Sequence, residues 1–181
     1  MKDRIYLIGY RGSGKSTVGP LLAQHLNWRY VDADTLFEQK HQTTIREYFA
    51  AQGEPAFRDR ESENLLELSR EHKTVISTGG GIVLREENRK IMKNTGFVVW
   101  LSASPETLFG RIHADMTTAD RRPNLAGGGL SEIQQMLDIR TPLYTQLADL
   151  QISCDSLFPD RVAAAILEAW DSRFSSSNPI S

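Results

Sequence analysis

The 181-residue chain is poor in cysteine: it contains one, Cys154. A single cysteine cannot close a disulfide within the chain, and no cluster of cysteine and histidine residues suggests structural zinc. This scarcity excludes a small secreted scaffold that depends on disulfides. We expect Cys154 to lie in or beside the last strand as a small apolar residue.

The chain also lacks an excess of charge of one sign and a long apolar run. Its formal net charge is −2, which gives no electrostatic reason to expect nucleic acid or an acidic membrane as a partner. The first apolar stretch ends at Gly9, too early for a signal peptide or a membrane span. With 40% hydrophobic and 24% charged residues, the composition is ordinary for a globular protein. These observations favour a soluble cytoplasmic enzyme.

Short apolar segments alternate with helical patterns along the chain. We expect strands at residues 5–8, 28–31, 75–76, 97–101 and 150–154, and helices at 15–26, from Ser104-Pro105-Glu106 onward and at about 160–170. Buried strands that alternate with helices indicate a parallel sheet covered on both faces, and hence a three-layer α/β fold. With no internal repeat or long linker, we expect one domain over residues 1–173 and a frayed tail at 174–181.

The strongest signal is Gly9-Tyr10-Arg11-Gly12-Ser13-Gly14-Lys15-Ser16, which matches the G-x-x-x-x-G-K-[ST] pattern of a phosphate-binding loop, or P-loop. It follows an expected strand and opens an expected helix, which is the context that the pattern requires. Backbone N–H groups of such a loop converge on phosphate oxygens, and the helix N-terminus adds partial positive charge. Lys15 would reach the β- and γ-phosphates, and the Ser16 hydroxyl would ligate Mg²⁺. The residues expected to bind nucleotide are Gly12, Ser13, Gly14, Lys15, Ser16 and Thr17. A glycine-rich turn that binds nothing is the alternative, and the coincidence of strand, loop and helix disfavours it.

Other features narrow the class of P-loop protein. The chain has no Asn-Lys-x-Asp tetrapeptide of a GTPase switch, and its apolar strands at 75–76 and 97–101 are not followed by the acidic residues of a motor ATPase. The carboxylates that work with Mg²⁺ are therefore expected at Asp32 and Asp34. Alternation in an extended segment would put both on one side, where one could hold metal-bound water and the other accept a hydroxyl proton. The alternative is a solvated loop or the N-cap of the next helix.

A kinase also needs groups that hold its second substrate. Arginine suits this role because its planar fork matches the two oxygens of a carboxylate or phosphate. The candidates are Arg58, Arg111, Arg122 next to Pro123, and Arg140. Solvated surface is the alternative for each of them.

Together these motifs resemble those of the shikimate kinases. The P-loop, Asp32-x-Asp34, Phe57-Arg58 with Glu61, Gly79-Gly80-Gly81, Arg122-Pro123 and Arg140-x-Pro-Leu-Tyr144 occur in that family's order, and the resemblance spans roughly residues 4–170. It implies a nucleoside monophosphate kinase-like P-loop NTPase fold with a five-stranded parallel sheet flanked by helices. It also implies ATP-dependent phosphorylation of the shikimate 3-hydroxyl, on the route to chorismate and aromatic amino acids, by a monomer that uses Mg²⁺.

The resemblance also implies which residues bind shikimate. Arg58 and Arg140 would clamp its carboxylate, and Glu61 would orient Arg58. Asp34 would bind the ring hydroxyls and act as base for the attacking one. The backbone of Gly79, Gly80 and Gly81 would approach the ring. This substrate-binding region would cover about residues 33–61.

For the nucleotide end, the resemblance implies that Arg111 and Pro159 sandwich the adenine. Ser16 would hold Mg²⁺ directly, and Asp32 through water. Arg122 would be the catalytic and substrate-binding arginine of a lid at about residues 113–129, which closes over both substrates. The segment 115–129 is longer and richer in glycine than the family pattern. Because Arg121 adjoins Arg122, this assignment depends on the following Pro123.

Two other functions fit parts of this pattern. A gluconate kinase of the same fold would also phosphorylate a polyhydroxylated carboxylate, but the glycine run at 79–81 and the Arg140 motif favour shikimate. A regulatory nucleotide-binding protein that has lost catalysis would show damage at reactive positions, whereas Lys15, Asp34 and Arg58 are present.

Overall fold

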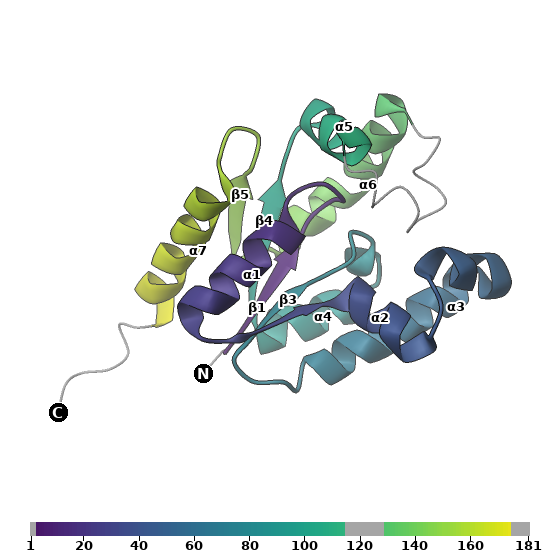
Figure 1. Ribbon diagram of the computed structural model, residues 1–181, viewed down its shortest axis with the longest axis horizontal. Coiled ribbons are helices and arrows are strands. Elements are labelled where there is room, and N and C mark those ends of the chain that lie inside the picture. Colours follow the sequence, from purple (N-terminus) through teal and green to yellow (C-terminus); the bar gives the residue numbers. More distant parts are fainter. Residues whose placement is uncertain (1–2, 115–128, 175–181) are drawn as a thin grey trace.

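A five-stranded sheet between two layers of helices forms the described part of the protein, as the computed structural model in Figure 1 shows. The structure describes residues 3–114 and 129–174. The strands are β1 (Arg4–Ile8), β2 (Arg29–Asp32), β3 (Thr74–Ser77), β4 (Phe97–Ser102) and β5 (Leu150–Ser153), in the spatial order β2-β3-β1-β4-β5. Every neighbouring pair is parallel, so the expected three-layer fold is confirmed.

The helices begin close to where the sequence predicts them. They are α1 (Lys15–Leu26), α2 (Ala33–His41), α3 (Ile45–Leu68), the 3₁₀ helix η1 (Ile82–Leu84), α4 (Glu86–Thr95), α5 (Pro105–Ala114), α6 (Leu130–Leu147) and α7 (Pro159–Phe174). The Oγ of Ser104 accepts a hydrogen bond from the N–H of Thr107 at 3.3 Å, which caps α5 as expected. Among the described helices, none is both long and apolar enough to cross a membrane.

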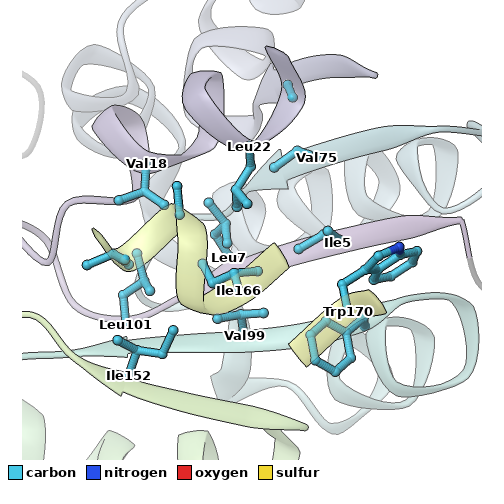
Figure 2. Packing of buried hydrophobic residues seen from close by; sticks show 14 of the residues in the cluster. Ile5, Leu7, Val18, Leu22, Val75, Val99, Leu101, Ile152, Ile166 and Trp170 are labelled. Carbon is cyan, nitrogen blue, oxygen red and sulfur yellow. The ribbon is translucent and has the colours of Figure 1, made fainter. Parts of the chain in front are cut away.

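Alternate residues of the central strands support the two opposite layers. Ile5 and Leu7 of β1 belong to a core with α1 and α7, in which Leu22, Ile166 and the other labelled side chains of Figure 2 interdigitate. The neighbouring β1 residues Tyr6 and Ile8 belong to a second core, formed with α3, α4 and α6. Because successive side chains of a strand point to opposite faces, one short strand anchors both layers.

The carboxyl ends of the parallel strands all lie at one edge of the sheet. The P-loop follows β1, Asp32 ends β2, Thr78 follows β3, and Cys154 follows β5. The chain passes from β1 to β2 on one side and later to β4 on the other, so β1 lies where the strand order reverses. Ligands of open α/β sheets bind at such an edge.

The segment expected to bind substrate comprises α2 and the first two-thirds of α3. Helix α3 is interrupted at Gly53, whose φ of 80° and ψ of 168° are not helical, and Pro55 follows two residues later. A φ of this sign suits glycine, and proline at a helix start needs no hydrogen-bond donor. The break therefore lets the second part of α3 leave the direction of the first.

The expected lid and tail are only partly within the described residues. Residues 113–114 end α5, Gly129 is the N-cap of α6, and the rest of the lid, with Arg121 and Arg122, lies outside the described part. Phe174, the first residue of the expected tail, is the last of α7, and its ring lies 5.8 Å from that of Phe97. Residues 175–181 are likewise not described.

Candidate active site

The P-loop presents an uncapped helix N-terminus to the edge of the sheet. Gly14 is the N-cap of α1 with φ 100° and ψ 10°, a left-handed conformation that glycine adopts without a steric penalty. Gly14 contributes no side-chain hydrogen bond to the first turn of α1. Backbone donors and the helix dipole together make this position suitable for an anion.

Lys15 is held inside the loop that precedes it. Its side chain is largely buried, and its Nζ donates to the carbonyl oxygens of Gly9 at 2.9 Å and Tyr10 at 2.8 Å, and to the Oγ of Ser13 at 3.3 Å. The ammonium group therefore lies within the phosphate-binding loop, next to the N-terminus of α1.

A cleft of about 800 Å³ opens at this edge of the sheet and brings the expected nucleotide-binding residues together with Asp34 and Gly80. Its volume is typical of a small-molecule site. Of the residues predicted from the sequence, the cleft is lined by Gly12, Ser13, Gly14, Lys15, Ser16, Thr17, Asp32, Asp34, Gly80, Arg111 and Pro159. Arg58, Glu61, Gly79, Gly81 and Arg140 are not among its lining residues.

Asp32 and Asp34 both line the cleft, but not for the reason that the sequence suggested. Asp32 is the last residue of β2 and the N-cap of α2, and its Oδ1 accepts from the N–H of Thr35 at 3.0 Å. Asp34 already lies in the first turn of α2, so side-chain alternation in a strand does not relate the two. The expected extended segment is therefore wrong beyond Asp32. The N-cap alternative is correct for Asp32, which combines this role with its place in the cleft.

Arg58 is held by two carboxylates of its own helix. Its Nη1 donates to Glu61 Oε2 at 2.7 Å, and its Nε and Nη2 donate to Glu54 Oε1 at 3.2 and 3.0 Å. Arg58 and Glu61 are both buried, whereas the Glu54 side chain is about half exposed. The sequence analysis missed Glu54, although the spacing of four residues is that of a helical ion pair.

The guanidinium of Arg58 lies directly against the glycine run at 79–81. A Cβ built on Gly81 would lie 2.5 Å from Arg58 Nη2 and 2.6 Å from Nη1. Only a residue without a side chain permits this approach. Arginine has five N–H donors, and the bonds to Glu54 and Glu61 use three of them, so two remain for a ligand.

Arg140 reaches the same glycine run from α6. Its Nη1 would lie 3.5 Å from a Cβ on Gly80, and Tyr144, one helical turn later, donates from its hydroxyl to the Gly80 carbonyl oxygen at 2.6 Å. Tyr144 is fully buried and stacks on Trp100, with ring centroids 5.5 Å apart. The glycine run is thus approached by Arg58 at Gly81 and by Arg140 at Gly80.

The other end of the cleft is built by the loop between β5 and α7. Arg111 donates to the carbonyl oxygens of Cys154 at 2.5 Å and Gly12 at 3.4 Å, and so joins this loop to the P-loop. Cys154 is buried beside β5 as expected, and burial raises the pKa of its thiol.

Asp155, which the sequence analysis missed, fastens this loop to the start of α5. Its Oδ1 accepts from the backbone N–H and the Oγ of Ser104, each at 2.8 Å. These hydrogen bonds, the backbone one foremost, hold the pKa of the Asp155 carboxyl well below its usual range. Its contacts lie 51 residues away in the chain, so no local pattern could have singled it out.

Comparison with known proteins shows the family of the chain. The family model described as shikimate kinase matches residues 11–171. A shikimate kinase of Rhodopirellula baltica is 45% identical over 168 residues, which cover 92% of this chain and 90% of that protein. A shikimate kinase of Symbiobacterium thermophilum is 42% identical over 170 residues, covering 93% and 97%.

Solved structures agree with these sequence relatives. The shikimate kinase of Acinetobacter baumannii, determined in complex with shikimate, superimposes with a TM-score of 0.89 at 34% identity and covers 96% of each chain. That of Bacteroides thetaiotaomicron gives a TM-score of 0.86 at 34% identity, covering 93% of this chain and 98% of the other. The P-loop, the acidic pair and the two arginines at the glycine run thus occur in a chain that belongs to the shikimate kinase family.

Proposed function

We propose that this cleft transfers the γ-phosphoryl group of ATP to the 3-hydroxyl of shikimate, the reaction of the family to which the chain belongs. The observation that carries the proposal is the arrangement at the edge of the sheet. The P-loop, Asp34 and Gly80 line one cleft, and two arginines from different helices contact the glycine run that contains Gly80. A polyhydroxylated carboxylate bound there would have its charged end at the arginines and its hydroxyls towards the phosphates.

ATP would occupy the end of the cleft that the P-loop and the β5–α7 loop form. The N–H groups at the start of α1 would bind phosphate oxygens, and Lys15 would exchange its carbonyl partners for the β- and γ-phosphates. Arg111 and Pro159 both line this end, which supports their assignment to the adenine.

The residues present fit a magnesium ion at the phosphates. The Ser16 hydroxyl and the Asp32 carboxylate line the cleft, and oxygen donors of this kind, completed by phosphates and water, are what Mg²⁺ prefers. Asp32 already accepts hydrogen bonds from Thr35 and from the Tyr30 hydroxyl, which favours an indirect role through water over a direct bond. When bound, Mg²⁺ would supply positive charge that offsets the negative charge of the phosphates.

Shikimate would bind through its carboxylate to Arg58 and Arg140, with the backbone of residues 79–81 against its ring. The buried Glu61, which accepts a hydrogen bond from Arg58, would orient the guanidinium and leave its remaining donors for the ligand. Asp34 would then accept the proton of the 3-hydroxyl as that oxygen bonds to the γ-phosphorus, while the bond to the leaving ADP breaks. Positioning and charge stabilisation supply most of the catalysis in such a transfer.

Some expectations rest on the sequence and the family alone. Arg122 would stabilise the transferred group from the lid. A monomeric state, action in the cytoplasm, and the absence of nucleic-acid or membrane partners also remain predictions. Single-domain organisation over residues 1–173 is proposed on the same basis.

The experiment that tests this function is ADP release by the purified protein with Mg²⁺ and ATP. Shikimate, gluconate, nucleoside monophosphates and no acceptor would be compared in parallel. Release that depends on shikimate is the expected result. Release with gluconate or a nucleotide instead would retain the P-loop assignment and refute the substrate site. A folded protein that binds ATP but releases no ADP with any acceptor would favour a regulatory role.

A further inference from the structure

Tyr10 occupies the first variable position of the P-loop, yet its side chain is buried away from the phosphate site. Only 2% of Tyr10 is exposed, and it belongs to an apolar cluster with Leu108 and Ile112 of α5 and Ile133 of α6. A residue of the nucleotide-binding loop is thus anchored between α5 and α6, and α6 carries Arg140. Its backbone carbonyl oxygen also accepts the 2.8 Å hydrogen bond from Lys15 Nζ.

The ring of Tyr10 lies beneath the guanidinium of Arg140. The Cζ of Arg140 is 5.5 Å from the ring centroid, a distance at which a cation is attracted to an aromatic face. The guanidinium also donates from Nη2 to the Met136 sulfur, at 3.7 Å. A thioether sulfur is a weak, uncharged acceptor.

Arg140 differs in this respect from Arg58, the other arginine at the glycine run. Arg58 is fixed by hydrogen bonds to Glu54 and Glu61, which also offset its charge. Within the described residues, Arg140 forms no ion pair with a carboxylate. An aromatic face holds a guanidinium without occupying its N–H donors, which lie in the plane of the group. Its charge, and its N–H donors other than the one directed at the Met136 sulfur, therefore stay available for an anionic ligand.

We propose that Tyr10 is a positioning residue that holds Arg140 ready for the substrate carboxylate. This inference rests on the proposed function, because it takes Arg140 as a ligand of that carboxylate. A long arginine side chain loses rotamer freedom when it is fixed on binding, and a surface that holds it beforehand reduces that cost. The P-loop would thus bind the nucleotide through its backbone and, through the ring of Tyr10, also assist the binding of shikimate.

The test compares Tyr10→Leu, which removes the ring, with Tyr10→Phe, which retains its face. Tyr10→Leu is expected to raise the KM for shikimate roughly three- to tenfold, the range of a cation–π contact, with smaller changes in kcat and in the KM for ATP. Tyr10→Phe is expected to have the same KM for shikimate as the wild type. Phe109→Leu, which removes an aromatic ring packed against the same cluster, is the matched control and should leave the KM unchanged. Should Tyr10→Leu fail to fold, Tyr10→Met fills the space without a ring and gives the same test.

A double-mutant cycle with Arg140→Ala identifies the residue through which Tyr10 acts. Arg140→Ala alone should raise the KM for shikimate, and Tyr10→Leu should add nothing in that background. An equal rise in both backgrounds would overturn the inference, as would a larger effect on ATP than on shikimate or a Tyr10→Phe variant as impaired as Tyr10→Leu. If Arg140→Ala raised the KM and Tyr10→Leu did not, only the inference would fail. An unchanged KM in Arg140→Ala would instead refute the substrate site, and the inference with it.

Discussion

Replacing Gly81 by alanine should displace Arg58 without disturbing the backbone. Gly81 has φ −90° and ψ −3°, which alanine adopts without strain, so the new methyl group is the whole perturbation. That group would lie 2.5 Å from Nη2, 2.6 Å from Nη1 and 2.7 Å from Cζ of the Arg58 guanidinium. Optimal contacts between such atoms are about 3.5–4.0 Å, so the guanidinium must move by roughly 1 Å.

The substitution should lower the activity with shikimate far more than the stability of the fold. The displaced atoms are the end of a flexible side chain, so we expect a loss of about 1–3 kcal/mol in the free energy of unfolding and a folded protein. A misplacement of about 1 Å in a substrate-positioning group can cost on the order of 10²-fold in rate. We therefore expect kcat/KM for shikimate to fall by about 10- to 100-fold, with the KM for ATP nearly unchanged.

Steady-state kinetics and thermal denaturation of two variants would measure this. Gly110→Ala is the matched control, because it lies in α5 with no atom within 4 Å of its new Cβ. Alanine in a helix interior should stabilise that variant by about 0.5–1 kcal/mol and leave its kinetics unchanged. A Gly81→Ala enzyme with normal kcat/KM for shikimate would refute the role of Arg58 against the glycine run.

Three further outcomes are expected. Asp34→Asn should lower kcat about 10²- to 10⁴-fold with little change in the KM for ATP, and unchanged turnover in steady-state assays would exclude Asp34 as base and ligand. Arg122→Ala should abolish most turnover while Arg121→Ala has a mild effect, and the reverse ranking in the same assay would refute the lid assignment. Asp155 has a folded-state pKa below its unfolded value, so its bonds to Ser104 stabilise the protein above about pH 4 and lose that contribution as the pH falls towards the folded pKa. Calorimetry should therefore show a lower melting temperature for Asp155→Asn than for the wild type at pH 7, and a smaller difference at pH 3; a constant difference would contradict this.

Local patterns predicted most of what lies along single segments of the chain. The P-loop could be predicted because its glycines, lysine and serine lie within eight consecutive residues, and their conformation depends on neighbours in sequence. The strands and the starts of α1 and α5 followed from apolar runs and an N-cap serine. Boundaries shifted by a residue or more, as at β2, which runs to Asp32.

Contacts between distant segments were beyond such patterns. The sequence predicted both aspartates at the cleft, yet from an extended segment that is in fact the start of α2. Glu54 could have been found from its helical spacing to Arg58. The contact of Tyr10 with Arg140 joins residues 130 positions apart by number and depends on how α6 packs on the P-loop.

The parallel α/β architecture, the phosphate site and the residue types typical of the shikimate kinase family could all be predicted before the fold was known, because periodicity and short motifs encode them locally. The partners of each arginine, by contrast, depend on how the helices pack. Arg58 is fixed by carboxylates of its own helix, whereas Arg140 lies on an aromatic ring from the P-loop. That difference arises from the packing of elements around the carboxyl edge of the sheet, where side chains remote in sequence become neighbours.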